Sequence, residues 1–329
     1  MKNSSYALDI IVPHYKEPWE TVQKFFAMLD IQRGVDFDSF RVILVNDGEE
    51  NAFPDDSFDL CPYRVDQLSI PHAGVSAARN HGIRNASAEW VMFCDCDDMF
   101  FHPYAMEDIM NVLPARETDL LWSDFFMESK KDPRGPVIQK KGFNAVFVHG
   151  KLFRRTFLMD NDLFFDEEIG YCEDSLFCTF AYTMADENRV GHIVSQVPPY
   201  VWCDTEGSVT NVNKTKDIAP ISVFHRNKKV CELYRDRRSY DEYCCMVART
   251  VMDAYHSLNV LPLTDKMIAM KADFRAWFNS HKKEWENVPY DTLKAIKESS
   301  RKSMYPSDSN FQERITVTQW LRYLEKEGA

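Results

Sequence analysis

The sequence lacks any run of apolar residues long enough to cross a membrane. Spanning a bilayer takes about 20 consecutive, mostly apolar residues, and no segment of this 329-residue chain approaches that length. The first five residues lead directly into a strand-like run, without the hydrophobic core and small-residue cleavage site of a signal peptide. We therefore expect a cytoplasmic protein, or one that is peripheral to a membrane.

Paired cysteines and an excess of basic charge are also missing. The nine cysteines include no C-x-x-C pair, the spacing that supplies zinc ligands or redox disulfides. Several of them, such as Cys94, Cys178 and Cys203, lie in apolar stretches, which predicts buried reduced thiols. Lys and Arg number 39 against 51 Asp and Glu, a net charge of −12. Such an acidic chain is unsuited to nucleic acid, because that binding depends on neutralising phosphates.

No G-x-G-x-x-G loop follows a strand-like segment, which disfavours a dinucleotide-binding dehydrogenase. The first half instead alternates apolar strand-like runs with helix-like stripes. Buried strands are predicted at residues 8–13, 41–46, 63–70, 89–94 and 119–126, with helices after Pro18 and over 74–83. Strands that alternate with helices at this spacing predict an α/β fold on a mostly parallel sheet.

The composition changes after about residue 213, where the chain becomes helical and rich in Lys, Arg, Glu and aromatic residues. We predict a first domain over residues 1–212 and a helical C-terminal segment over 213–329. The last helix of that segment is expected at residues 312–327. Acceptor binding and oligomerisation are both open as roles for this segment.

Polar residues follow three of the predicted strands at the point where each one ends. They occupy residues 14–17 after the first strand, 46–48 after the second and 95–98 after the fourth. In mostly parallel sheets, ligands bind at the carboxyl ends of the strands. Three separate segments are therefore expected to converge on one crevice.

The acidic residues after the fourth strand are candidates for a metal site. The chain contains three D-x-D triplets, at Asp36/Asp38, Asp95/Asp97 and Asp160/Asp162. Only the second directly follows an apolar strand. Carboxylates there suit a hard cation such as Mg²⁺ or Mn²⁺, which would also bind a diphosphate. Turn and capping acids before Pro103 are the alternative interpretation, and position alone favours neither.

Four further side chains are ambiguous when taken singly. Asp47 precedes a glycine, which is typical of a tight turn, although its carboxylate could accept a hydrogen bond from a base. Arg79 lies in a helix of small residues, where it could pair with the acidic cluster or with phosphate. Glu173 and Asp174 suit a helix N-terminus, and two such close carboxylates raise the pKa of one of them.

Seven segments together resemble the family 2 glycosyltransferases with the GT-A fold. They occur in the order and spacing of that family, over about residues 7–210. The segments are Ile10–Tyr15, Asp30–Gln32, Val45–Gly48, Gly74–Gly82, Phe93–Asp98, Gly150–Arg155 and Glu173–Asp174. The resemblance implies a sugar transfer from a nucleotide-sugar donor, usually a UDP-sugar, to an acceptor hydroxyl.

The resemblance also implies how the donor is bound. Pro13, Tyr15 and Glu17 would line the nucleoside pocket, and Asp47 would hold the base, usually uracil. Arg79 would lie near the diphosphate.

The remaining roles that the resemblance implies concern metal and chemistry. Asp95 would approach the ribose or the donor sugar, and Asp97, with Asp95, would hold Mn²⁺ or Mg²⁺. Cys96, between them in the donor site, replaces the small residue that is common there. Asp174 matches the general base, with Glu173 beside it, and the family inverts the anomeric centre in one displacement.

Two departures narrow the expected activity, and two alternatives stay open. The Q-x-x-R-W motif of processive synthases is absent, as are membrane spans, so we expect single-sugar transfer onto a glycan or another hydroxyl acceptor. A nucleotidyltransferase would also use an acidic α/β domain, but its glycine-rich phosphate loop has no counterpart at residues 13–17. A catalytically inactive relative that binds a partner or glycan through its helical tail is the other alternative.

Overall fold

The computed structural model describes residues 6–48, 50, 52–113, 117–130, 135–205, 218–260, 264–304 and 315–326. The chain divides into two compact units: the residues up to 208, apart from 169–172, form the first, and residues 169–172 with those after 208 form the second. The predicted boundary between residues 212 and 213 lies outside the described residues. Among the described helices, none combines the length and the apolar character that crossing a membrane requires.

A seven-stranded sheet forms the centre of the first unit, in the order β10-β6-β9-β4-β1-β2-β3. Only β9 runs antiparallel to its neighbours, β4 and β6. The mostly parallel sheet predicted from the sequence is therefore confirmed. The strands are β1 (Leu8–His14), β2 (Phe40–Asp47), β3 (Arg64–Ile70), β4 (Trp90–Phe93), β6 (Leu120–Ser123), β9 (Lys151–Arg154) and β10 (Val190–Ile193).

The register of β1 and β2 brings their polar ends to the same edge of the sheet. The two strands pair in parallel from Leu8 opposite Phe40 to His14 opposite Asn46. All seven residues of β1 are buried, as its continuous apolar run predicts for a strand covered on both faces. The residues that follow β1 and β2 consequently emerge side by side.

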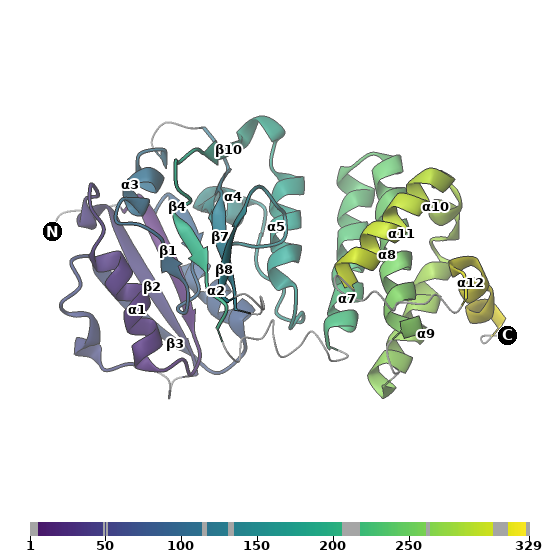
Figure 1. The fold of residues 1–329 in the computed structure, drawn as a ribbon, viewed down its shortest axis with the longest axis horizontal. Helices are drawn as coiled ribbons and strands as arrows, with labels where there is room; N and C mark the ends of the chain where they lie inside the picture. The colour runs from purple at the N-terminus through teal and green to yellow at the C-terminus, as the bar shows by residue number, and fades with distance from the viewer. Residues whose placement is uncertain are drawn as a thin grey trace. The chain divides into compact units, whose positions relative to one another are not determined.

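Helices cover both faces of this sheet (Figure 1). Helix α1 (Trp19–Asp30) packs its predicted stripe, which includes Phe25 and Leu29, against one face. Helix α2 (Val75–Asn85) packs against the other face and contacts β1 and β2. It lies so close that a Cβ atom at Gly82 would come within 2.4 Å of Ile11 Cγ2. The remaining helices of this unit are α3 (Ala105–Met110), α4 (Arg155–Asp160) and α5 (Glu173–Met184).

A smaller four-stranded sheet, in the order β5-β11-β7-β8, was not predicted. Its strands are β5 (Met99–Phe100), β7 (Phe125–Ser129), β8 (Val137–Lys141) and β11 (Tyr200–Trp202). The prediction of one strand over residues 119–126 was wrong, because the chain leaves the large sheet after Ser123 and enters the small one at Phe125. Apolar residues lie on both sides of Ser123 and Asp124, so the prediction included this polar pair in one strand.

The second unit is helical, as predicted. Its helices are α7 (Ile218–Arg237), α8 (Tyr240–Val260), α9 (Asp265–Asn279), α10 (Lys282–Glu286), α11 (Tyr290–Met304) and α12 (Val317–Lys326). Phe224, Tyr255, Phe274 and Trp320 pack together in its core. Of the last helix predicted at 312–327, residues 312–314 and 327 lie outside the described residues, and Ile315 and Thr316 precede α12.

The three cysteines predicted to be buried are placed largely as expected. Cys94 and Cys178 are buried in the core, and Cys203 is half-buried. Burial raises the pKa of the Cys178 thiol to about 12. Such a thiol is uncharged at neutral pH and packs as a small apolar side chain.

Candidate active site

The carboxyl ends of the first two strands are joined by a buried polar contact. His14 Nδ1 lies 3.0 Å from Asn46 Oδ1, and Asn46 Nδ2 donates to the Leu68 carbonyl of β3 at 3.0 Å. Both His14 and Asn46 are buried. The first two of the three predicted segments therefore meet at one edge of the sheet.

Tyr15 is the exposed side chain among the residues predicted to line a nucleoside pocket. Its ring, 36% exposed, stacks on His72 with centroids 4.1 Å apart and planes 11° from parallel. The Glu17 carboxylate accepts the Tyr15 backbone N–H at 2.6 Å. Pro13 is buried within β1 opposite Val45. An aromatic surface thus stands just beyond the end of β1.

Asp47 holds the loop that leads into α2. Its Oδ1 accepts the Ala73 N–H at 2.7 Å, and its Oδ2 accepts the Gly74 N–H at 2.9 Å. His72 Nδ1 also lies 2.8 Å from Oδ2. Asp47 is 2% exposed, so its carboxylate organises this loop as well as standing beside the Tyr15–His72 stack. His72 was not predicted, because it lies in a loop before a helix and carries no motif of its own.

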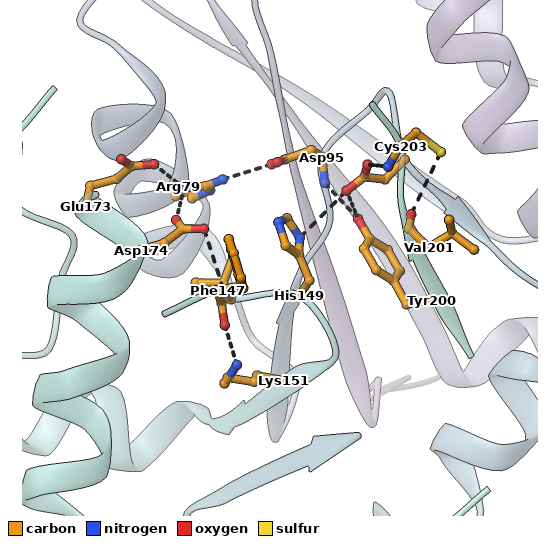
Figure 2. A network of polar contacts seen from close by, with 12 residues as sticks. Arg79, Asp95, Phe147, His149, Lys151, Glu173, Asp174, Tyr200, Val201 and Cys203 are labelled. Atoms are coloured by element: carbon orange, nitrogen blue, oxygen red, sulfur yellow. Dashed lines mark hydrogen bonds and ion pairs between the residues drawn. The ribbon is translucent and has the colours of Figure 1, made fainter. Parts of the chain in front are cut away.

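Arg79 bridges acidic residues from two distant segments of the chain, as Figure 2 shows. Its Nη2 donates to Asp95 Oδ1 at 2.8 Å. Its Nη1 donates to Asp174 Oδ1 at 2.6 Å and to Glu173 Oε1 at 3.1 Å. The guanidinium is buried, and although burial disfavours its charge, the three carboxylates raise its pKa above the ordinary value. The acids after β4 and those that begin α5 therefore face one another across a single cation.

The negative charge in this site exceeds what one guanidinium can balance. Burial, followed by the charge of Asp174, raises the pKa of Glu173 to about 7. Burial and the charge of Asp95 raise the pKa of Asp97 to about 6. Burial opposes the charge of Asp95 as well, but Arg79 outweighs it and lowers the pKa of that carboxyl. The site consequently favours the arrival of positive charge.

A further acid lies deeper, beside His149. Asp98 accepts the Tyr200 O–H and the Cys203 N–H, both at 2.7 Å. His149 Nδ1 is 3.6 Å from Asp98 Oδ2, and within the described part of the chain it has no hydrogen-bond partner. Burial lowers the pKa of His149, so its ring is neutral at neutral pH.

These side chains compose a candidate cation site that differs from the predicted one. One ligand atom each from Asp95, Asp98 and His149 lie within 4.8 Å of one another. Asp95 belongs to the predicted pair, whereas Asp97 stands outside this group and is half-buried. Cys96, predicted in the donor site, is buried in the core cluster that also contains Cys94. His149 was not predicted, because its only signal in the sequence is that it precedes the motif beginning at Gly150.

A mostly parallel sheet with acidic residues at its carboxyl edge, and two further acids opposite them, defines the GT-A class of glycosyltransferase domains. The family model described as glycosyl transferase family 2 matches residues 9–172, about half of the chain. The chain belongs to this family.

Two curated relatives illustrate the similarity in sequence. Poly(ribitol-phosphate) beta-N-acetylglucosaminyltransferase TarS of Staphylococcus aureus is 27% identical over 153 residues, which cover 44% of this chain and 26% of TarS. The uncharacterized glycosyltransferase YwdF of Bacillus subtilis is 30% identical over 145 residues, 40% of this chain and 52% of YwdF. The matches thus span about a quarter and about half of these relatives.

Solved structures show the same fold. The structure of S. aureus TarS 1–349 in complex with UDP-GlcNAc superposes with a TM-score of 0.60 at 17% identity, covering 91% of this chain and 90% of that one. A second structure of TarS 1–349 gives a TM-score of 0.59 at 16% identity, over 94% of this chain and 93% of that one. The GT-A fold predicted from the sequence is confirmed.

Proposed function

We propose that this chain is a metal-dependent, inverting glycosyltransferase that moves a sugar from a UDP-sugar to a hydroxyl of a glycan or cell-surface polymer. The observation that carries the proposal is the Arg79 bridge. The Arg79 guanidinium donates to Asp95, at the donor edge of the sheet, at 2.8 Å. On its other side it donates to Asp174 at 2.6 Å and to Glu173 at 3.1 Å. Donor-binding and proton-accepting groups thus share one small site.

The choice of a uridine nucleotide is supported by the end of β1 and by the relatives. An exposed Tyr15 ring offers a flat surface for a base. The buried Asp47 carboxylate beside it accepts the Ala73 and Gly74 N–H groups, and a base N–H would share that carboxylate with them. One solved structure of TarS is a complex with UDP and another is a complex with UDP-GlcNAc. We propose the same donor class here, with the sugar itself open to test.

A divalent cation fits the donor set of this site. The carboxylates of Asp95 and Asp97 are hard oxygen ligands. Burial, followed by the charge of Asp95, raises the pKa of Asp97, and a cation bound between the two carboxylates would offset that charge. Asp98 is already engaged by Tyr200 and Cys203, so we assign the metal to Asp97 and Asp95, as the sequence predicts. When bound, Mn²⁺ or Mg²⁺ would supply Lewis-acid stabilisation of the charge that develops on the diphosphate.

The proposed reaction is one displacement at the anomeric carbon. The acceptor oxygen forms a bond to that carbon while the bond to the β-phosphate oxygen breaks, and UDP leaves with the electron pair. The acceptor hydroxyl is a weak nucleophile until a positioned carboxylate takes its proton. Asp174 is the proposed base, with Glu173 beside it, and Arg79 orients both while it stabilises charge near the leaving group.

Release of UDP from a panel of UDP-sugars tests this proposal. We expect release in the presence of Mn²⁺ or Mg²⁺ and its loss in excess EDTA, and Asp97→Ala should abolish it in protein that remains folded. Turnover that persists in EDTA would show that the reaction needs no metal. Folded protein that binds UDP but releases none from any UDP-sugar would favour the inactive, glycan-binding alternative.

A further inference from the structure

Lys151 is a buried cation to which the proposed reaction assigns no role. It follows Gly150 in the motif Gly150–Arg155 and is the first residue of β9, with 2% of its surface exposed. Burial lowers the pKa of its ammonium, while Cys178 and Asp174 act in the opposite direction. Burying an ammonium is costly, so a specific use of this side chain is expected.

The ammonium of Lys151 fastens a short turn that ends at its own strand. Its Nζ donates to the backbone carbonyl of Phe147 (Figure 2). Cys178 Sγ approaches the same carbonyl at 3.4 Å from α5, one turn beyond Asp174. The carbonyl of Phe147 is therefore held both by β9 and by the helix that begins with the two candidate catalytic acids.

The other end of the turn is fixed by Gly150. Its φ of 69° is in the left-handed region, which favours glycine. A Cβ atom at this position would come within 2.9 Å of Ser123 Oγ. The Ser123 N–H donates to the Gly150 carbonyl at 2.7 Å. Residues 147–150 are thus tied to β6 at one end and to β9 and α5 at the other.

The turn of residues 147–150 contacts two acids of the site, Asp174 and Asp98. Figure 2 shows Phe147 and His149 of this turn near Asp174. The Val148 N–H points to Asp174 Oδ2 at 3.5 Å, and His149 lies 3.6 Å from Asp98. A displacement of the turn would move both contacts at once. The Lys151 ammonium bonds to the Phe147 carbonyl rather than to either acid, so its influence on them passes through this backbone and through its charge.

We propose that Lys151 is a positioning residue for Asp174. By holding the Phe147 carbonyl it keeps the Val148 N–H against the carboxylate, and its charge balances part of the negative charge of that site. This inference rests on the proposed function, which makes Asp174 the proton acceptor. The contact described for Lys151 is with the turn and not with β1 or β2, so we expect donor binding to be unaffected by its loss.

Kinetics of Lys151→Met and Lys151→Gln test the proposal, with UDP-GlcNAc as donor and water as acceptor. Misplacing a reacting group by about 1 Å costs up to about 10²-fold in rate. We expect kcat to fall about 10- to 100-fold for Lys151→Met, with donor KM and UDP affinity within about twofold of wild type. Lys151→Gln keeps an N–H donor without the charge, so its kcat should lie between the two.

The matched control is Leu152→Ala, which removes buried packing from the next residue of β9. It should lower the melting temperature but leave the kcat of the folded protein nearly unchanged. A wild-type kcat in Lys151→Met would overturn the proposal, as would a loss of UDP affinity as large as the loss of rate. Failure of both Lys151 variants to fold would reduce Lys151 to a structural residue and would also overturn it.

Hydrogen exchange gives a second test that does not depend on turnover. Lys151→Met should accelerate exchange over residues 147–150 and 173–178 and leave β2 unchanged. Unchanged exchange in those two segments, or acceleration throughout the sheet, would contradict a positioning role. If the wild-type protein neither binds UDP nor releases it from UDP-GlcNAc, the proposed function fails, while the exchange data still decide whether Lys151 holds the turn.

Discussion

At the scale of single residues, the site depends on how one guanidinium is shared. Arg79 donates to Asp95 on one side and to Asp174 and Glu173 on the other. The sequence alone did not decide whether Arg79 forms an ion pair with acidic residues or contacts a ligand. A helix pattern does not show which residues of other segments lie next to a side chain. The ion pairs are present, and a diphosphate arriving at Asp95 would compete for the same guanidinium.

Asp174→Asn should lower kcat by about 10²–10⁴-fold, the usual contribution of a positioned acid–base group. The substitution keeps the shape of the side chain and removes the basic oxygen, so UDP affinity should be almost unchanged. Glu173→Gln is the matched variant and should cost less. Steady-state kinetics beside UDP calorimetry separate the two acids, and normal turnover by Asp174→Asn would place the base elsewhere.

The rate should rise with pH through the pKa of Glu173, about 7. Below that pH Glu173 is neutral and Arg79 is shared between Asp95 and Asp174. Above that pH the charged Glu173 carboxylate competes with Asp174 for the Arg79 guanidinium. The weaker ion pair of Asp174 then leaves its carboxylate better able to accept a proton. In Glu173→Gln, whose side chain is always neutral, the rise of kcat with pH near 7 should therefore be absent. An unchanged rise in that variant would assign the titration to another group.

At the scale of elements, sequence patterns predicted β1, β2 and β4 because these strands are buried along almost their whole length and form continuous apolar runs. The prediction of a buried strand at residues 63–70 was only partly right, because β3 is mostly half-buried. The small sheet was not predicted as a separate sheet, although the residues of β11 (Tyr200–Trp202) look strand-like in the sequence. Its strand β5 has only two residues, too few to show a period, and the prediction joined β7 to β6 as one strand. His149 and His72 were missed for a related reason, since their positions depend on turns that only the folded chain brings near the acids.

The close packing of α2 on β1 can be tested at Gly82. A side chain there would meet Ile11, because its Cβ would lie 2.4 Å from Ile11 Cγ2. Gly82→Val should therefore lower the free energy of unfolding by about 1–3 kcal/mol, the usual cost of overpacking. Denaturant unfolding measures it. Gly170→Val is the control, because a Cβ atom at Gly170 has no neighbour within 4 Å, and equal destabilisation by both variants would contradict the packing argument.

At the scale of the whole molecule, every residue proposed for donor binding belongs to the first compact unit. The sequence resemblance likewise covers this part, whereas the structures of TarS 1–349 superpose over 91% and 94% of the chain and therefore extend into the helical segment. Sequence therefore predicted the class of the first unit far better than any role for the second. The buried apolar residues of the second unit, such as Phe274 and Trp320, pack in its own core. These residues therefore stabilise the unit and do not indicate which ligand it binds.

Removal of the residues after 212 should leave UDP binding intact and should abolish acceptor use or lower solubility. The reason is that Tyr15, Asp47, Arg79, Asp95 and Asp97 all precede the truncation. Calorimetry with UDP on the truncated and full chains measures the first part. A truncated protein that keeps the circular-dichroism signal of its α/β unit but no longer binds UDP would show that the helical unit contributes to the donor site.

The proposed function requires that the edge of the sheet near Asp47, Arg79 and Asp97 binds a uridine nucleotide together with a divalent metal. A thermal-shift measurement with UDP, with and without Mn²⁺, reports this binding and needs no acceptor. A ligand at about 100 times its Kd stabilises the folded state by about 2.7 kcal/mol, which raises the melting temperature by several degrees. We predict such a rise with UDP and Mn²⁺ together, and its loss in Asp97→Ala. No rise with any uridine nucleotide, or the same rise in Asp97→Ala without metal, would show that this edge is not a metal-dependent uridine nucleotide site.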